Sequence, residues 1–98
     1  MAHLKLRFEW DENKAESNYR KHGITFEDAT EAFFDRDRIE EPNRIVGGEE
    51  RWQTIGTIRG FTVLLVIHTI RENGVEVVRI ISARHATPAE RDRYYGNR

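Results

Sequence analysis

Residues 51–83, RWQTIGTIRGFTVLLVIHTIRENGVEVVRIISA, decide the fold. Three runs in this segment are rich in β-branched and other apolar residues, which is typical of strands. Arg59-Gly60 separates the first two runs, and the second connection contains Asn73-Gly74. That dipeptide favours a tight hairpin because both central positions of a type I′ turn need a positive φ. We therefore expect three consecutive strands at residues 51–58, 61–69 and 75–83.

The sequence before residue 51 predicts a strand, two helices and a short edge strand. Residues 4–10 alternate apolar and charged side chains with the period of a half-buried strand. Asp11 and Thr25 are suitable N-caps for two helices, and Gly23 supplies a stop between them. Residues 35–50 hold a proline, a Gly-Gly pair and many charges, so we expect an edge strand near residues 38–41 within a mobile loop.

A last helix follows the three strands. Thr87-Pro88-Ala89-Glu90 combines an N-cap, a proline at the first helical position and a glutamate that can reach back to the cap. The predicted order is β-α-α-β-β-β-β-α. Strands that cluster rather than alternate with helices indicate an α+β fold with a small, mostly antiparallel β-sheet flanked by helices. At 98 residues, we expect a single domain over residues 1–98.

Composition narrows the classes of function. The chain has 16 Lys and Arg against 17 Asp and Glu, so net charge alone predicts no nucleic-acid binding, and any such function must come from an uneven distribution. The distribution is uneven: acids crowd residues 9–50, whereas arginines outnumber acids from Arg51 onward.

Several kinds of site are not expected. The chain has no cysteine, which excludes disulfides, thiolate zinc sites and cysteine nucleophiles. The histidines show no metal-binding spacing, and Gly47-Gly48 lacks the lysine of a phosphate loop, so we expect no metal and no cofactor. The longest apolar block, residues 63–67, is far too short to span a membrane, and we expect a soluble protein of the cytoplasm.

The hairpins predict a row of basic side chains. Two-residue turns at Asn73-Gly74 and Arg59-Gly60 would place His68 opposite both Arg79 and Arg51 on one face. A three-residue loop with a bulge at Gly60 would instead bring Glu50 opposite His68.

Two interpretations of this row remain open. Nearby carboxylates would neutralise the arginines in a solvated ladder, as surface ion pairs commonly do. Alternatively the row binds an anion, because arginine matches phosphate with two parallel hydrogen bonds and histidine can exchange protons near neutral pH. Cleavage of RNA through its 2′-hydroxyl needs both kinds of group. We expect the phosphate contacts and the proton transfers to come from five residues, Glu50, Arg51, His68, Arg79 and Arg84.

Other side chains are candidates for wider RNA contacts. Arg20 and Lys21 would extend a track for phosphates, and His85 directly follows Arg84. Tyr95, on the last helix, either packs on the sheet or stacks on a base.

Three stretches resemble the BrnT toxins of bacterial type II toxin–antitoxin modules. They are FEWDENKAESNYRKHGITFEDATEAFFD at residues 8–35, GEERWQTIG at 48–56 and VRIISARHATPAERDRYY at 78–95, in the order and at nearly the spacing of that family. The matching motif positions are Arg20-Lys21-His22-Gly23, Glu50-Arg51, Arg79, Ser82 and Arg84. His85 departs from the pattern, since relatives often carry Arg or Lys there.

The resemblance implies a RelE-like fold and a metal-independent endoribonuclease that arrests translation. It also implies a BrnA-like antitoxin partner, an RNA substrate, and contact with operator DNA only through the antitoxin complex. RelE-like enzymes share no invariant catalytic set. The rival hypothesis is a noncatalytic relative, either a ParE-like inhibitor of a protein target or a co-repressor.

Overall fold

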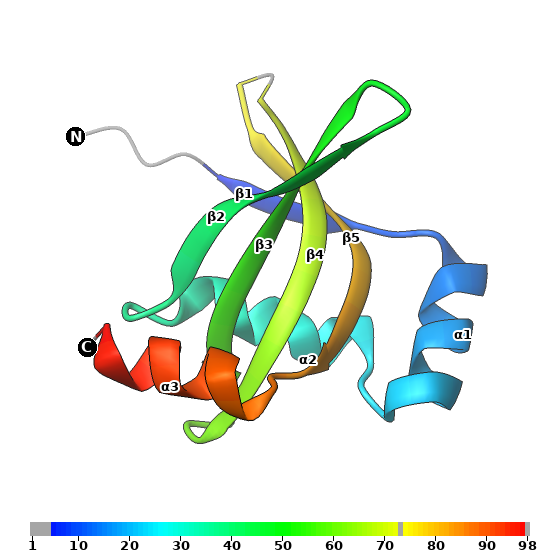
Figure 1. The fold of residues 1–98 in the computed structure, drawn as a ribbon. Helices are drawn as coiled ribbons and strands as arrows, with labels where there is room; N and C mark the ends of the chain where they lie inside the picture. The colour runs from blue at the N-terminus through cyan, green and yellow to red at the C-terminus, as the bar shows by residue number, and fades with distance from the viewer. Residues whose placement is uncertain (1–4, 73, 98) are drawn as a thin grey trace.

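The computed structural model describes residues 5–72 and 74–97. Five strands form one sheet in the order β1-β5-β4-β3-β2, and β1 is parallel to β5 while every other pair is antiparallel (Figure 1). In chain order the elements are β1 Leu6–Glu9, α1 Glu12–His22, α2 Phe26–Ala29, the 3-10 helix η1 Thr30–Phe34, β2 Ile39–Val46, β3 Glu49–Ile58, β4 Thr62–Glu72, β5 Glu76–His85 and α3 Pro88–Gly96. The predicted α+β class and element order are confirmed, and the sheet is mixed only through β1.

The helices divide the sheet into two faces. α2 and η1 cover one face, here called the η1 face, where Phe26, Phe33, Leu64, Val66 and Ile80 are buried together. α3 lies across part of the other face, the α3 face (Figure 1). α1 stands beside β5, so the upper part of the α3 face stays uncovered between α1 and the β2–β3 hairpin. Of the helices described, none has the length and apolar character needed to cross a lipid bilayer.

The prediction of a mobile loop within residues 35–50 is wrong. β2 continues through Val46 and pairs with β3 down to Val46 opposite Glu49, so Gly47 and Gly48 form a tight hairpin turn. Both glycines have positive φ, 56° and 81°, which a type I′ turn requires and glycine adopts without steric cost.

Both predicted hairpin registers are also wrong. Ile58 pairs with Thr62 across residues 59–61, and Glu72 pairs with Glu76, so each connection has three residues rather than two. Asn73, on which the second prediction depended, lies outside the described residues. Each added residue shifts the pairing by one and moves side chains to the other face.

The shift places His68 between two apolar neighbours. Trp52 and Ile80 lie opposite His68 on either side, on the buried η1 face. The predicted row of Arg51, His68 and Arg79 therefore does not exist. The alternative, Glu50 opposite His68, is wrong as well, because Trp52 is the β3 residue that pairs with His68.

A bulge in β5 turns its second half over. Ile67 pairs with Ser82 and His68 pairs with Ile80, so β5 has one extra residue, Ile81, at this point. Strict alternation would send Ser82 to the face opposite Arg79. Because of the bulge, Arg79, Ser82 and Arg84 all belong to the α3 face.

Candidate phosphate-binding site

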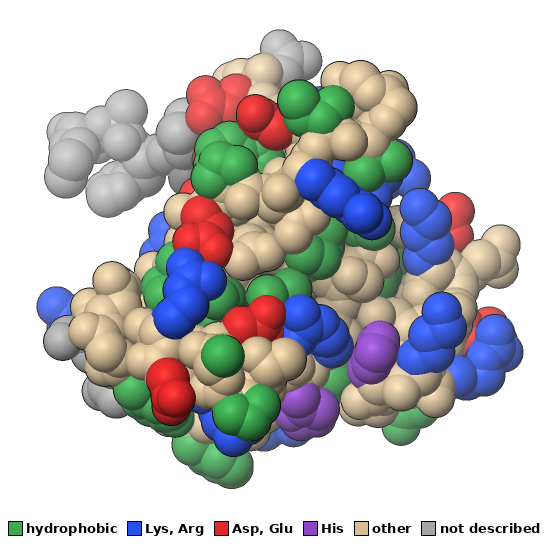
Figure 2. Space-filling model, viewed as in Figure 1, with side chains coloured by type: hydrophobic (Ala, Val, Ile, Leu, Met, Phe, Trp, Pro, Cys, Tyr) green, Lys and Arg blue, Asp and Glu red, His purple; other side chains and the backbone are tan. Residues whose placement is uncertain are grey.

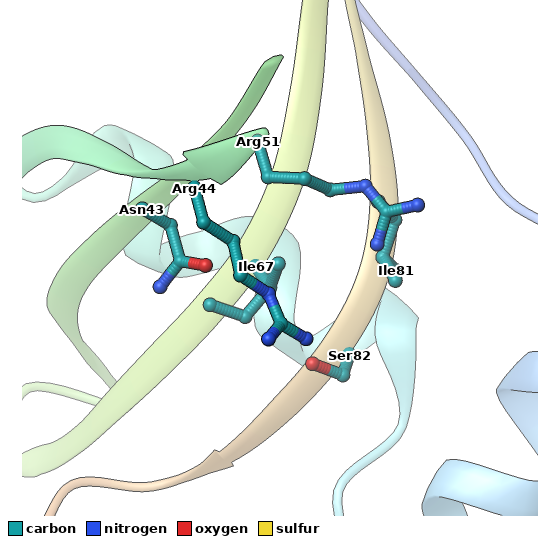
Figure 3. Close-up of a pocket in the computed structure, with 6 residues that line it drawn as sticks. All are labelled: Asn43, Arg44, Arg51, Ile67, Ile81 and Ser82. Carbon is teal, nitrogen blue, oxygen red and sulfur yellow. The ribbon is translucent and has the colours of Figure 1, made fainter. Parts of the chain in front are cut away.

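A pocket of about 420 Å³ lies on the uncovered part of the α3 face. It is lined by two neighbouring residues of β2, one residue each of β3 and β4, and the bulge of β5: Asn43, Arg44, Arg51, Ile67, Ile81 and Ser82. We call it the arginine pocket. In Figure 3, Arg44 and Arg51 both reach across β4, with the guanidinium of Arg44 directed toward Ser82 and that of Arg51 beside Ile81.

The hairpin turn at Gly47-Gly48 brings the two arginines together, because it pairs Arg44 with Arg51 across β2 and β3. Arg51 is largely covered, with 21% of its side chain exposed, and its Nε is buried without a hydrogen bond to any described residue. The Glu49 carboxylate is 3.4 Å from that Nε. Arg44 is exposed and makes no ion pair with any described residue. The positive charge of the pocket is thus only partly compensated.

A chain of hydrogen bonds holds the β2 side of the pocket. Arg93 of α3 donates to Glu41 at 2.6 Å, Gln53 donates to the other oxygen of Glu41 at 2.7 Å, and Asn43 donates to Gln53 at 2.8 Å. The hydrogen bond from Arg93 lowers the pKa of Glu41, so this carboxylate stays ionised. α3 therefore helps to fix Asn43 at the pocket wall.

A second pocket, of about 250 Å³, adjoins the first between α1 and β5. Ile81 and Ser82 line both pockets, and the other wall of the second is a face of α1: Lys14, Ser17, Asn18, Lys21 and His22. We call it the α1 pocket. The buried Asn18 side chain joins α1 to β5 by donating to the Ala83 carbonyl at 2.9 Å and accepting from the Ala83 amide at 3.1 Å.

No acidic residue is among the described residues that line the two pockets. The chain as a whole has one more acid than base, so this separation is a local property of the folded surface. Figure 2 shows Lys and Arg side chains gathered around the hollow between the sheet and α1. A concave surface of one sign attracts and orients an anion.

The structure brings the predicted catalytic residues together only in part. Arg51 lines the arginine pocket, whereas Glu50 is exposed and alternates to the other face of β3. Arg79 is exposed on the α3 face, opposite Thr69. A hydrogen bond from Arg71 lowers the pKa of Glu9, and the charge of Arg79 adds to this lowering.

Arg84 is held by α3. Its two terminal nitrogens donate to the two carboxylate oxygens of Glu90 at 2.8 and 3.0 Å, which raises the pKa of Arg84 and lowers that of Glu90. Glu90 also accepts from the Thr87 amide at the helix start. Arg84 does not line either pocket.

His68 lies on the opposite side of the sheet from the arginines. None of its surface is exposed, its ring packs edge-on against Phe33 at 4.8 Å between centroids, and its Nε2 is 2.8 Å from the Thr54 hydroxyl. Burial lowers the pKa of His68 to about 4, against a smaller opposing effect of the Thr69 backbone. At neutral pH the ring is therefore uncharged and shielded from solvent.

The predicted RNA contacts are also divided. Lys21 lines the α1 pocket, but the neighbouring Arg20 makes an exposed ion pair with Glu16 at 2.8 Å. His85 and Tyr95 are exposed and line neither pocket, and the Tyr95 ring packs edge-on against the buried Tyr94.

Sequence reasoning missed Asn43, Arg44 and Lys14. A signal for Arg44 was present, because a two-residue turn at Gly47-Gly48 pairs residue 44 with residue 51 by simple counting. Lys14 precedes Lys21 by seven residues, which is two helical turns and places both on one face. Ser82 was found only through the family resemblance.

Fold and site together define a small α+β protein with a cationic, concave surface on one face of its sheet. Residues 10–90 match the family described as "Ribonuclease toxin, BrnT, of type II toxin-antitoxin system". The chain therefore belongs to the BrnT family of ribonuclease toxins, whose partner in such a system is an antitoxin.

A solved structure supports the assignment. The chain is similar to the crystal structure of the ribonuclease toxin BrnT of Brucella abortus, with 27% identity and a TM-score of 0.59. The similarity covers 87% of this chain and 99% of the Brucella chain. No curated protein matches. Among the described residues, no group of three or more His, Asp or Glu side chains is placed to hold a metal ion.

Proposed function

We propose that the arginine pocket binds the phosphodiester of RNA that this endoribonuclease cleaves, and that cleavage of RNA arrests translation. The observation that carries the proposal is the cross-strand pair Arg44 and Arg51, whose charges meet in a pocket with no acidic lining residue among those described. Guanidinium groups fit phosphate oxygens with paired hydrogen bonds, and such contacts supply most of the affinity for nucleic acid.

The chemistry is attack of the ribose 2′-oxygen on the adjacent phosphorus. A bond forms between that oxygen and phosphorus, the bond to the 5′-oxygen breaks, one proton leaves the 2′-oxygen and one reaches the 5′-oxygen. Negative charge grows on the phosphate oxygens, and Arg44 and Arg51 would stabilise it without any metal or cofactor. The buried, neutral His68 is not part of this proposed site. Proton transfer by Glu50, and phosphate contacts of Arg79 and Arg84, stay predictions.

The finer biological roles belong to the same proposal. Family membership supports a BrnA-like antitoxin as the inhibitor, with operator DNA bound only by the toxin–antitoxin complex, and action in the cytoplasm, where messenger RNA is found. Because the family is described as ribonucleases, it favours RNA cleavage over the ParE-like or co-repressor alternative.

The test is RNA cleavage by purified protein in the presence of EDTA, with Arg44→Ala and Arg51→Ala. We expect the natural chain to cleave RNA with the chelator present, and each variant to lose roughly 10²-fold in rate, the usual cost of removing one charge-stabilising donor. Induced expression without antitoxin should degrade messenger RNA while leaving DNA intact. Intact RNA, or full cleavage by folded Arg51→Ala protein, would contradict the proposal.

A further inference from the structure

The α1 pocket has features that the arginine pocket does not explain. Its two lysines, Lys14 and Lys21, make no ion pair with any described residue. The acids of α1 are engaged elsewhere: Glu16 pairs with Arg20, and Glu12 accepts a hydrogen bond from Trp10. The lysine charges therefore face the hollow without a carboxylate among its described lining residues.

The two pockets form one path across the surface. Ile81 and Ser82 are common to both, so the β5 bulge is the point where the pockets meet. The Asn18 hydrogen bonds to Ala83, the next residue, fix α1 at this point, which makes the distance between the lysines and the arginines a property of the fold. A chain with a phosphate at every nucleotide can occupy both pockets at once.

We propose that the α1 pocket is a second phosphate subsite, in which Lys14 and Lys21 bind a neighbouring phosphate of the RNA strand held by Arg44 and Arg51. The proposal rests on the proposed function and extends it to the substrate class: a single strand that carries at least two consecutive phosphates. Lysine suits a subsite that only positions the strand, because its ammonium acts as a point charge without a fixed fork geometry. Ser17 and Ser82 add hydroxyl donors to the same hollow.

The test measures salt-dependent binding of a fluorescent single-stranded RNA octamer with 2′-O-methyl groups, which prevent cleavage. Each phosphate contact on a single strand contributes about 0.7 to the slope of log affinity against log salt. Each pair is proposed to hold one phosphate, so the double variant Lys14→Ala/Lys21→Ala should lose about 0.7 of this slope, and Arg44→Ala/Arg51→Ala a similar amount. The variant with all four changes should lose about 1.4, because the pairs act on different phosphates. Arg36→Ala, an exposed arginine in the turn after η1, is the charge control and should keep the natural slope.

Two results would overturn the second subsite. The first is a folded lysine variant whose slope of log affinity against log salt equals that of the natural chain. The second is a four-residue variant whose slope falls no further than that of either double variant, because both pairs would then contact one shared phosphate. Cleavage of unmodified RNA tests the proposed function separately. If the arginine variants are inactive while the lysine variant binds as the natural chain does, only the second subsite is wrong. If the arginine variants cleave normally, the proposed function itself is wrong.

Discussion

Arg44 and Arg51 are direct cross-strand neighbours on β2 and β3, and their side chains share one pocket. Like charges directly opposite each other destabilise an antiparallel pair. A sheet under selection for stability alone has many better choices at these two positions, such as threonine or an opposite charge. The pair is consistent with the proposed phosphate ligand, whose negative charge would remove the repulsion on binding.

This conflict predicts opposite changes in stability and activity. Arg44→Thr should raise the free energy of unfolding by roughly 0.2–1 kcal/mol, because it removes the repulsion and threonine favours strands. The same change should reduce RNA cleavage roughly 10²-fold. Urea denaturation and a cleavage assay on one preparation measure both. Arg36→Thr, at an exposed position outside the strands, should gain no such stability, and an Arg44→Thr protein that is less stable yet fully active would contradict the argument.

The carboxylate of Glu90 makes two sets of hydrogen bonds, and two different substitutions can separate their contributions to stability. It accepts two hydrogen bonds from Arg84 and it closes the capping box of α3 with Thr87. Glu90→Gln keeps a capping side chain but removes the charge, so it should cost at most about 1 kcal/mol, as partly exposed ion pairs do. Glu90→Ala loses the cap as well and should cost about 1 kcal/mol more. Chemical denaturation compares the two, and equal stabilities would show that the cap contributes nothing.

The same substitution changes the surface charge. Glu90→Gln leaves Arg84 without its carboxylate on the α3 face, so single-stranded RNA should bind more tightly at low salt, and the gain should vanish as salt is raised. Fluorescence anisotropy over a salt series measures this. An affinity unchanged at every salt concentration would place Arg84 outside the RNA path.

The sequence predicted the elements well and the site only in part, for identifiable reasons. Caps, glycine stops and β-branched runs are local signals, and they correctly indicated α1, α3 and the three long strands. Register depends on the length of a turn, and one extra residue at 59–61 moved His68 from the expected arginine row into the core. The β5 bulge left no sequence signal that we recognise, yet it determines that Ser82 and Arg84 share a face with Arg79.

Buried His68 predicts how stability responds to acid. Its pKa is lowered to about 4 in the fold, below the value of about 6.5 for an unfolded chain. As pH falls, the unfolded chain therefore takes up the proton before the folded chain does. The contribution of neutral His68 to the free energy of unfolding is complete above about pH 6.5 and is lost as pH falls toward 4. The difference corresponds to about 3 kcal/mol.

Two measurements check the acid response. The imidazole NMR signal of His68 should titrate near pH 4. The free energy of unfolding should fall less steeply between pH 6.5 and 4 in His68→Gln, which removes the titrating ring but can still bond to Thr54. A His68 signal that titrates near the value of about 6.5 for an unfolded chain would contradict the buried placement.

Gly56 tests how closely β3 approaches η1. A Cβ at this position would lie 2.7 Å from the Ala32 carbonyl oxygen and 3.3 Å from the Ala32 Cβ. Backbone cannot rotate away as a side chain can, so Gly56→Ala should cost about 1–3 kcal/mol of the free energy of unfolding through overpacking.

Gly96→Ala is the matched control: nothing lies within 4 Å of its Cβ, and at the end of α3 the change should be neutral or stabilise by up to about 1 kcal/mol. Because Asp35 follows η1 and accepts hydrogen bonds from Thr57 and Tyr94, displacement of η1 should also loosen α3. Hydrogen exchange in α3 should therefore accelerate in Gly56→Ala, and unchanged stability together with unchanged exchange would mean that η1 does not pack on Gly56 as described.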